Sequence, residues 1–391
     1  MKLEKNREGP MFLKEINIFK EMEKGKIKIA GAGLAGLTAA INLAKAGFEV
    51  EVHEKCSKIG DHYKENPQML PNWFYKEDVI EELERCNVKI KWLNRINEVR
   101  VYLPRQEIVF YGEKTPVGYT VLRGGENSFE KDLARQAVEA GAMIITDSPV
   151  NVRKENFDII ATGLGKPITV GYGRVYKGEF NPEKAKVFFD PSLTPTVGYC
   201  YLFPHSQNVV TVKISRLIGE EGVNIRENFE KFKEKFLKDE IKEKNFLYEF
   251  GSLRSFDIPK SAIINNSLII GEAAGFQDEL FRFGMRYAIL SGYFAAKSII
   301  EGLNYDNLWQ GRFMKEFQRT GKTKKIFVDL KKQGFNVLSG EPELFVDIEK
   351  FKKLWLSRKA DFLLTSYPIY KSLLLNRGFM KIVLKAFLKL N

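Results

Sequence analysis

A glycine-rich turn near the start of the chain constrains the fold more than any other feature. The segment "KIKIAGAGLAGLTAAINLAKAGFEVEVHEK" has the pattern of a short β-branched strand, a turn, a helix and a second strand. Gly31, Gly33 and Gly36 form G-x-G-x-x-G between the first strand and the helix. The first glycine of such a turn permits the bend, the second lets backbone N–H groups approach a pyrophosphate, and the third lets the helix lie close to the strand. The sequence therefore predicts a dinucleotide-binding unit.

An acidic residue supports this interpretation. Glu54 stands at the end of the second strand, where a carboxylate can accept hydrogen bonds from a ribose diol. The unit alone leaves both NAD and FAD open as the bound nucleotide.

A second glycine-rich turn far along the chain favours FAD. "LIIGEAAG" predicts a strand and a tight turn, and Met285 to Ile300 predicts a helix with small residues along one face. A nicotinamide cofactor crosses one sheet and needs no second turn of this kind, whereas the flavin end of FAD reaches a second helix start. There the helix N-terminus can stabilise negative charge on the reduced ring. A tightly packed helix pair without a ligand is the alternative.

The segments between these turns predict antiparallel strands. "NEVRVYLPRQEIVFYG" has the pattern of a hairpin, "KVFFD", "GYCYLFP" and "NVVTVKIS" are further strands, and residues 225–243 form a charged helix. We therefore predict an α/β fold, α+β overall, with a discontinuous Rossmann-type FAD-binding domain, an inserted antiparallel-sheet substrate domain and a helical C-terminal region. The predicted ranges are 26–60, 124–165 and 258–303 for the first domain, 61–123 and 166–257 for the second, and 304–391 for the third.

Composition excludes several classes of protein. The three cysteines and three histidines lack ligand spacing, so we predict no metal site. The net charge is +12, but lysines alternate with acids as on solvated helix faces, and no nucleic-acid-binding module is present. The chain has no apolar run of membrane-spanning length and its N-terminus does not resemble an export signal, which predicts a cytoplasmic protein.

The C-terminal segment has a basic amphipathic pattern. Arg377, Lys381, Lys385 and Lys389 recur every four residues between apolar side chains. Such a helix can lie in an anionic membrane interface, making the protein peripheral to the membrane, or it can dock on the body of the protein. Both alternatives stay open.

Several motifs in the same order resemble a known family. "IAGAGLAGLTAA…VEVHEK", "FDIIATG", "SLIIGEAAG" and "GMRYAILSGYFAA" together resemble the glutathione-reductase-like group of FAD oxidoreductases, and within it the geranylgeranyl reductase branch, over about residues 26–300. The resemblance implies an FAD-dependent oxidoreductase. The FAD-binding residues that it implies are Gly31, Gly33, Ala35, Gly36, Glu54, Lys55, Arg123, Val150, Ala161, Thr162, Gly163, Gly271, Glu272, Gly284 and Met285.

"GYCYLFP" resembles the aromatic substrate-domain strand Y-x-W-x-F-P of prenyl reductases, with Leu202 in the place of the tryptophan. This resemblance implies that Tyr201, Phe203 and Pro204 form walls of a substrate pocket, and a plain aromatic core strand is the alternative. The chain also departs from its relatives. It lacks a proline before the flavin-facing glycines, where "FQDELFRFG" stands, and it lacks the Asp-Gly element that follows Ala-Thr-Gly in the aromatic hydroxylases.

The predicted reaction is the reduction of C=C bonds in a hydrophobic isoprenoid-like or lipid-like substrate. It needs a hydride from the flavin, a proton donor near the substrate, and an external electron donor such as ferredoxin or NAD(P)H. Asp278, Glu279 and Tyr201 are candidate proton donors, and solvation or helix capping is the other interpretation of the two acids. A flavin-dependent monooxygenase and an FAD-containing, membrane-associated lipid-binding protein without turnover are the alternatives.

Overall fold

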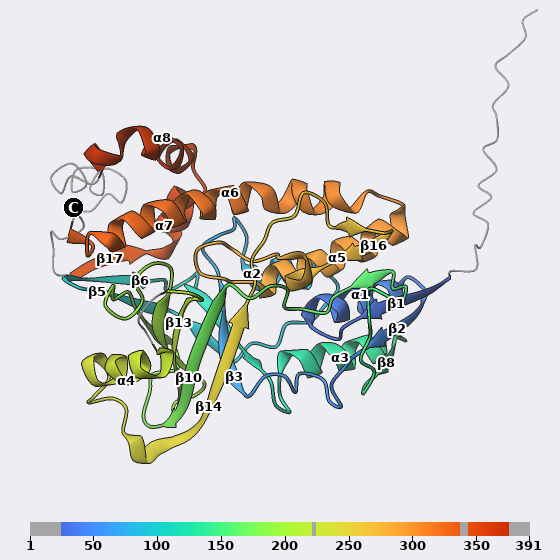
Figure 1. The fold of residues 1–391 in the computed structure, drawn as a ribbon, viewed down its shortest axis with the longest axis horizontal. Coiled ribbons are helices and arrows are strands. Elements are labelled where there is room, and N and C mark those ends of the chain that lie inside the picture. The colour runs from blue at the N-terminus through green and yellow to red at the C-terminus, as the bar shows by residue number, and fades with distance from the viewer. Residues whose placement is uncertain (1–24, 221–223, 337–342, 375–391) are drawn as a thin grey trace, which may run out of the picture.

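The computed structural model describes residues 25–220, 224–336 and 343–374. The predicted basic helix at 377–389 lies outside these residues. Within them, three sheets and the helices packed on them form the molecule (Figure 1). The α/β fold class predicted from the sequence is confirmed.

A six-stranded sheet contains the glycine turn. Its strand order is β15-β16-β9-β1-β2-β8, and all neighbours are parallel except β15 and β16. Helices α1 (Leu34–Lys45) and α3 (Phe129–Glu139) pack together, and α5 (Met285–Glu301) packs on α1. The strands are β1 (Lys26–Ala30), β2 (Glu49–His53), β8 (Met143–Ile145), β9 (Ile159–Ile160), β15 (Ile263–Ile264) and β16 (Ser267–Ile269).

A larger, eight-stranded sheet lies beside it, in the order β14-β10-β13-β12-β11-β5-β6-β17. The predicted hairpin is confirmed as β5 and β6. Helix α4 (Ile225–Phe236) packs on β10 and β13, with Phe229 and Phe232 in an aromatic core. The strands are β5 (Glu98–Leu103), β6 (Gln106–Tyr111), β10 (Thr169–Lys177), β11 (Lys184–Phe188), β12 (Tyr199–Pro204), β13 (Val209–Leu217), β14 (Phe246–Arg254) and β17 (Glu343–Asp347).

Helix α4 is shorter than the predicted range of 225–243. Leu237 leaves the helical conformation, and its side chain is buried together with Ile241 in the aromatic core. The charged pattern continues beyond this point in the sequence, but the two apolar side chains turn the backbone toward the core.

The third sheet has three strands in the order β3-β7-β4, and it contacts β12 through β3 and α3 through β7. Its strands are β3 (Asn66–Pro71), β4 (Asn94–Ile96) and β7 (Gly118–Arg123), and α2 (Val79–Glu84) follows β3 in the chain. The division of the chain into the predicted domains stays a prediction.

The C-terminal region was predicted to be helical, and it contains α6 (Tyr305–Lys332), α7 (Ile348–Trp355) and α8 (Arg358–Leu374). It also supplies β17, which pairs in parallel with β6 at the edge of the eight-stranded sheet. Helix α6 runs along most of the length of the molecule (Figure 1). Near its end Lys331 donates hydrogen bonds to the Thr194 hydroxyl and the Gly198 carbonyl, between β11 and β12. Helix α6 also packs on α5.

The small-residue face of α5 serves helix packing. A Cβ atom at Gly292 would overlap the backbone carbonyl of Ala35 in α1. Ser291 accepts a hydrogen bond from the Gly271 N–H at 2.9 Å. The first turns of α5 face a cavity, through Met285 and Ala288. Along most of this face α5 therefore packs tightly on α1, as in the alternative without a ligand. At its N-terminal end the same face borders the cavity.

Two helical glycines test this packing. Alanine favours a helix over glycine by about 0.5–1 kcal/mol, so Gly311→Ala in α6, where a Cβ meets no atom within 4 Å, should stabilise the protein slightly. Gly292→Ala should instead destabilise it by about 1–3 kcal/mol, because the added methyl group overpacks the helix contact. Urea unfolding monitored by circular dichroism measures both changes. Equal effects of the two substitutions would contradict the packing described.

Candidate functional site

The glycine turn between β1 and α1 is built from glycines with different roles. Gly31 has a φ of +105°, and a Cβ there would overlap the carbonyl of Ala161 on the neighbouring chain segment. A Cβ at Gly36 would overlap the Gly31 carbonyl. Gly33 has an ordinary φ of −84°, and a Cβ there would meet no protein atom within 4 Å. The fold itself therefore requires Gly31 and Gly36, whereas the space beside Gly33 is left open.

The carboxylate of Glu54 supports this turn from β2. Its two oxygens accept backbone N–H groups of Ala32 and Cys56, each at 3.0 Å. Glu54 is buried, so the two hydrogen bonds compensate for the loss of hydration of its charge. It stands at the carboxyl end of β2, where the sequence predicted a ribose-binding acid.

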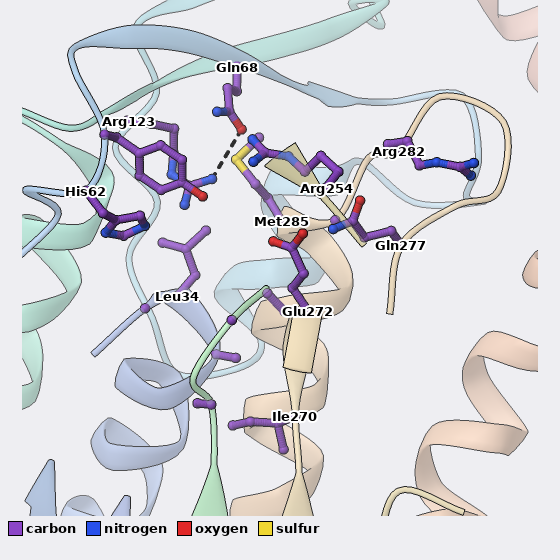
Figure 2. Close-up of a pocket in the computed structure, with 17 residues that line it drawn as sticks. Leu34, His62, Gln68, Arg123, Arg254, Ile270, Glu272, Gln277, Arg282 and Met285 are labelled. Carbon is purple, nitrogen blue, oxygen red and sulfur yellow. Dashed lines mark hydrogen bonds between the residues drawn. The ribbon is translucent and has the colours of Figure 1, made fainter. Parts of the chain in front are cut away.

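An outer cavity of about 650 Å³, including its open mouth, begins at Gly33. It contains the N-terminus of α1 and the N-terminus of α5 (Figure 2). The predicted FAD-binding residues that line it are Gly33, Ala35, Arg123, Ala161, Gly163, Glu272, Gly284 and Met285.

Other predicted FAD-binding residues are not among those that line this cavity. Lys55 and Thr162 are exposed, and Val150 is half-buried. Gly271 packs against Ala35, where a Cβ would lie 2.9 Å from the alanine Cβ. Gly31, Gly36 and Glu54 stand behind the turn and shape it. The roles of these residues toward a cofactor stay predictions.

Sequence reasoning missed several side chains that line the outer cavity: His62, Tyr63, Gln68, Arg254 and Arg282. Gln68 lies on β3 and Arg254 on β14, which are strands without a cofactor motif. Only tertiary structure brings them to the glycine turn. No local pattern in the sequence marks them, because both strands also carry other polar residues.

The charge around the outer cavity is mainly positive. Arg123 forms a buried ion pair with Glu130, lies over the Tyr63 ring at 4.5 Å from its centre, and donates to the Gln68 side-chain oxygen at 3.2 Å. Arg254 and Arg282 line the same space, and the single carboxylate among the lining residues of this cavity is that of Glu272. Glu272 accepts a hydrogen bond from the Ser255 N–H at 3.1 Å. Such a cavity suits a ligand with negative charges.

Gln277 is a direct indication that a ligand belongs here. Its side chain is 2% exposed, and its amide oxygen has no hydrogen-bond partner among the described residues. A buried amide oxygen without a partner costs free energy. Figure 2 shows the side chain beside Glu272 at the edge of the cavity. The sequence shows that Gln277 follows the second glycine turn, but it does not show this orientation of the side chain.

A second, inner cavity of about 580 Å³, including its open mouth, adjoins the outer one. The two share Gln68, Arg254, Arg282, Gly284 and Met285. Aromatic side chains surround the inner cavity, and Tyr201 stacks on Phe203 with ring centres 4.3 Å apart. Of the predicted pocket walls, Tyr201 and Phe203 line this cavity, whereas Pro204 does not and instead accepts a hydrogen bond from Asn94 through its carbonyl. The remaining lining residues are Met69, Tyr199, Lys213, Ser215, Ser252, Phe281 and Phe283.

The two acids considered as proton donors are not among the residues that line either cavity. Asp278 is buried and accepts backbone N–H groups of Leu280 and Phe281, at 3.0 and 2.7 Å, and of Phe283. Burial raises the pKa of Asp278 to about 6. Glu279 pairs with Lys324 at 2.8 Å. The structure thus places both acids in the framework of the loop that replaces the missing proline, and neither lines the inner cavity.

Comparisons with known proteins agree with this geometry. Residues 29–78 match the model of an NAD(P)-binding Rossmann-like domain. The chain is 24% identical over 372 residues to a digeranylgeranylglycerophospholipid reductase of Methanosarcina acetivorans, covering 80% of this chain and 87% of that one. It is also 24% identical to digeranylgeranylglycerophospholipid reductase 1 of Methanococcoides burtonii, covering 89% and 93% of the two chains.

Solved structures share the fold across most of the chain. A geranylgeranyl bacteriochlorophyll reductase-like protein of Thermoplasma acidophilum has a TM-score of 0.60 at 19% identity, covering 90% of this chain and 98% of that one. A flavoprotein/dehydrogenase of Cytophaga hutchinsonii has a TM-score of 0.61 at 16% identity, covering 89% and 98%. The fold is that of a flavoprotein. The resemblance drawn from the sequence motifs is confirmed, and the comparisons support FAD as the cofactor.

The open space at Gly33 and the unpaired oxygen of Gln277 are both features that a bound dinucleotide would use. We therefore expect Gly33→Val to leave the thermal stability of the cofactor-free protein nearly unchanged and to weaken FAD binding by ~100-fold or more, because the new side chain fills the space for the pyrophosphate. Differential scanning fluorimetry and quenching of FAD fluorescence measure the two quantities. As a control, Gly36→Val should destabilise the fold itself. Unchanged FAD binding by Gly33→Val would contradict this placement.

Proposed function

We propose that the protein is an FAD-dependent oxidoreductase that reduces C=C bonds of an isoprenoid or lipid-like substrate. The observation that carries the proposal is the junction of the two cavities. A polar, basic cavity that begins at a dinucleotide-binding turn opens directly into a second cavity whose wall contains five aromatic side chains. The similar proteins of Methanosarcina acetivorans and Methanococcoides burtonii are named as reductases of an isoprenoid lipid, digeranylgeranylglycerophospholipid. Their names support this choice of substrate.

The residues of the outer cavity would hold FAD in distinct ways. The N-terminus of α1 at Gly33 and Leu34 would face the pyrophosphate, since helix N-termini favour negative charge. Arg123 and Gln277 would bind polar atoms nearer the flavin, and the N-terminus of α5 at Gly284 and Met285 would stabilise negative charge on the reduced ring. When bound, FAD supplies the hydride. Ferredoxin or NAD(P)H would supply its electrons from outside.

The residues of the inner cavity would orient the substrate. Tyr201, Phe203 and Phe283 form an apolar surface, and burial of a hydrocarbon chain against such side chains is favourable at about 25 cal/mol per Å². The same walls would exclude water from the carbon atoms that react. The aromatic strand is thus assigned a role in substrate binding and not only in the core.

A flavin-dependent monooxygenase is the second candidate function. A flavin-dependent brominase shares the fold with a TM-score of 0.57 at 14% identity, covering 88% of this chain and 98% of that one. The fold alone therefore allows oxygen chemistry as well as reduction. The Asp-Gly element of hydroxylases is missing from "TGLGKPITVGYG", which favours the reductase.

The location of the protein in the cell is the next point that we propose. No helix in the described part of the chain is long and apolar enough to cross a membrane. We propose a cytoplasmic protein that reaches lipid substrates at the membrane surface through the basic segment 377–389. The FAD-containing lipid-binding protein without turnover shares this property, so turnover must be measured directly.

Anaerobic photoreduction separates the three functions. For a reductase, adding an isoprenoid lipid without oxygen should restore the absorbance of oxidised flavin and yield a product with one more saturated bond. A monooxygenase would instead need oxygen for product formation, and a lipid-binding protein would give no product in either case. Mass spectrometry follows the lipid, and visible absorbance follows the flavin. Reoxidation by oxygen alone, with no saturated lipid, would contradict the proposed function.

A further inference from the structure

Strand β13 presents a lysine to the inner cavity. Val210, Val212 and Ile214 of this strand lie in the aromatic core under α4. Side chains alternate across a strand, so Lys213 and Ser215 lie on the opposite face, where both line the inner cavity. Lys213 is only 8% exposed, which is rare for a lysine.

The neighbouring strands leave room for this side chain. On β10, a Cβ at Gly171 would lie 2.7 Å from the Lys213 Cε atom. On the other side, Tyr201 of β12 stands opposite Lys213 in the strand register. The Lys213 Nζ atom lies 5.8 Å from the centre of the Tyr201 ring and 5.9 Å from that of Phe250 on β14. The side chain thus runs over a glycine between aromatic rings.

Lys213 has no acidic partner. Among the described residues its side-chain amine makes no hydrogen bond or ion pair, and no carboxylate lines the inner cavity. The other charged and titratable groups around the cavity are Arg254 of β14, Arg282 of the loop before α5, and the phenols of Tyr199 and Tyr201. Burial and the charge of Arg254 lower the pKa of Lys213 to about 7. The ammonium and the free amine are therefore both accessible near neutral pH.

The other groups at the inner cavity are poor proton donors. Burial raises the pKa of Tyr199 and Tyr201 far above the ordinary value, and arginine keeps its proton in proteins. Asp278 and Glu279 do not line the cavity. An efficient general acid has a pKa near the working pH and lies within reach of the reacting atom. Among the residues that line the inner cavity, Lys213 is therefore the side chain whose position and chemistry suit a proton donor.

We propose that Lys213 is the catalytic proton donor of the reduction, an inference that rests on the proposed function. One carbon of the C=C bond accepts the hydride, which carries both electrons. The other carbon forms its C–H bond with a proton from the Lys213 ammonium, whose N–H bond breaks and leaves a neutral amine. Solvent returns this proton before the next turnover. The external donor named above supplies the electrons, so the step is balanced.

Lys213→Met and Lys213→Arg test the proposal. Methionine has no proton to donate, whereas arginine keeps the positive charge but holds its proton too tightly to donate it. Lys177→Met, at the exposed end of β10, is the matched control. In anaerobic mixing of reduced protein with an isoprenoid lipid, both Lys213 variants should reoxidise ~100-fold or more slowly. The wild type and the control should lose rate as pH rises through about 7, because the ammonium is then lost.

A second measurement needs no turnover. Competitive acetylation of the oxidised protein, read by peptide mass spectrometry, should show the Lys213 amine becoming reactive near pH 7, far below an exposed lysine such as Lys177. Added alkylammonium ions should also restore part of the rate of Lys213→Ala, which a purely structural role would not allow.

The outcomes separate the two proposals. Full rate and an unchanged pH profile in Lys213→Met, with the wild type active, would overturn the role of Lys213 and leave the proposed function standing. Acetylation of Lys213 only at strongly alkaline pH would overturn it as well. If the wild type is not reoxidised by any isoprenoid lipid, the proposed function fails, and the role of Lys213 fails with it.

Discussion

The close approach of three backbone segments at the glycine turn determines the rest of the structure. Gly31 lies against Ala161, Gly36 lies against Gly31, and Gly292 of α5 lies against Ala35 of α1. These contacts leave no room for side chains, so they bring the N-termini of α1 and α5 to one cavity. A dinucleotide-binding turn and a second helix start then face the same space. The site follows from this packing.

The loop before α5 borders both cavities. Asp278 gathers the backbone N–H groups of this loop and so fixes the course of residues 278–283. That course sets Phe281 and Phe283 against the aromatic strand β12 and leaves Gly284 and Met285 at the junction. Asp278 thus shapes the pocket through its hydrogen bonds to the backbone of this loop, and its part in proton transfer stays a prediction.

The sequence predicted what depends on local patterns. Gly31, Gly33, Gly36 and Glu54 carry a motif whose spacing has a physical reason, and the fold class followed from it. Lys213 and Arg254 carry no motif, because their positions depend on the pairing of distant strands. The strand β17 was missed for a similar reason, since five residues between helices become a strand only beside β6. The contacts of Asp278 could not be predicted either, because a sequence does not show that its carboxylate accepts hydrogen bonds from the backbone of its own loop.

The position of the flavin ring tests the central claim most directly. A crystal structure of the protein with FAD should place the ring at the junction of the two cavities, beside Gly284, Met285 and Arg254, with one face toward Tyr201. The adenosine end should lie near Glu54. A ring bound elsewhere, or a junction filled by protein side chains after FAD has bound, would contradict the account.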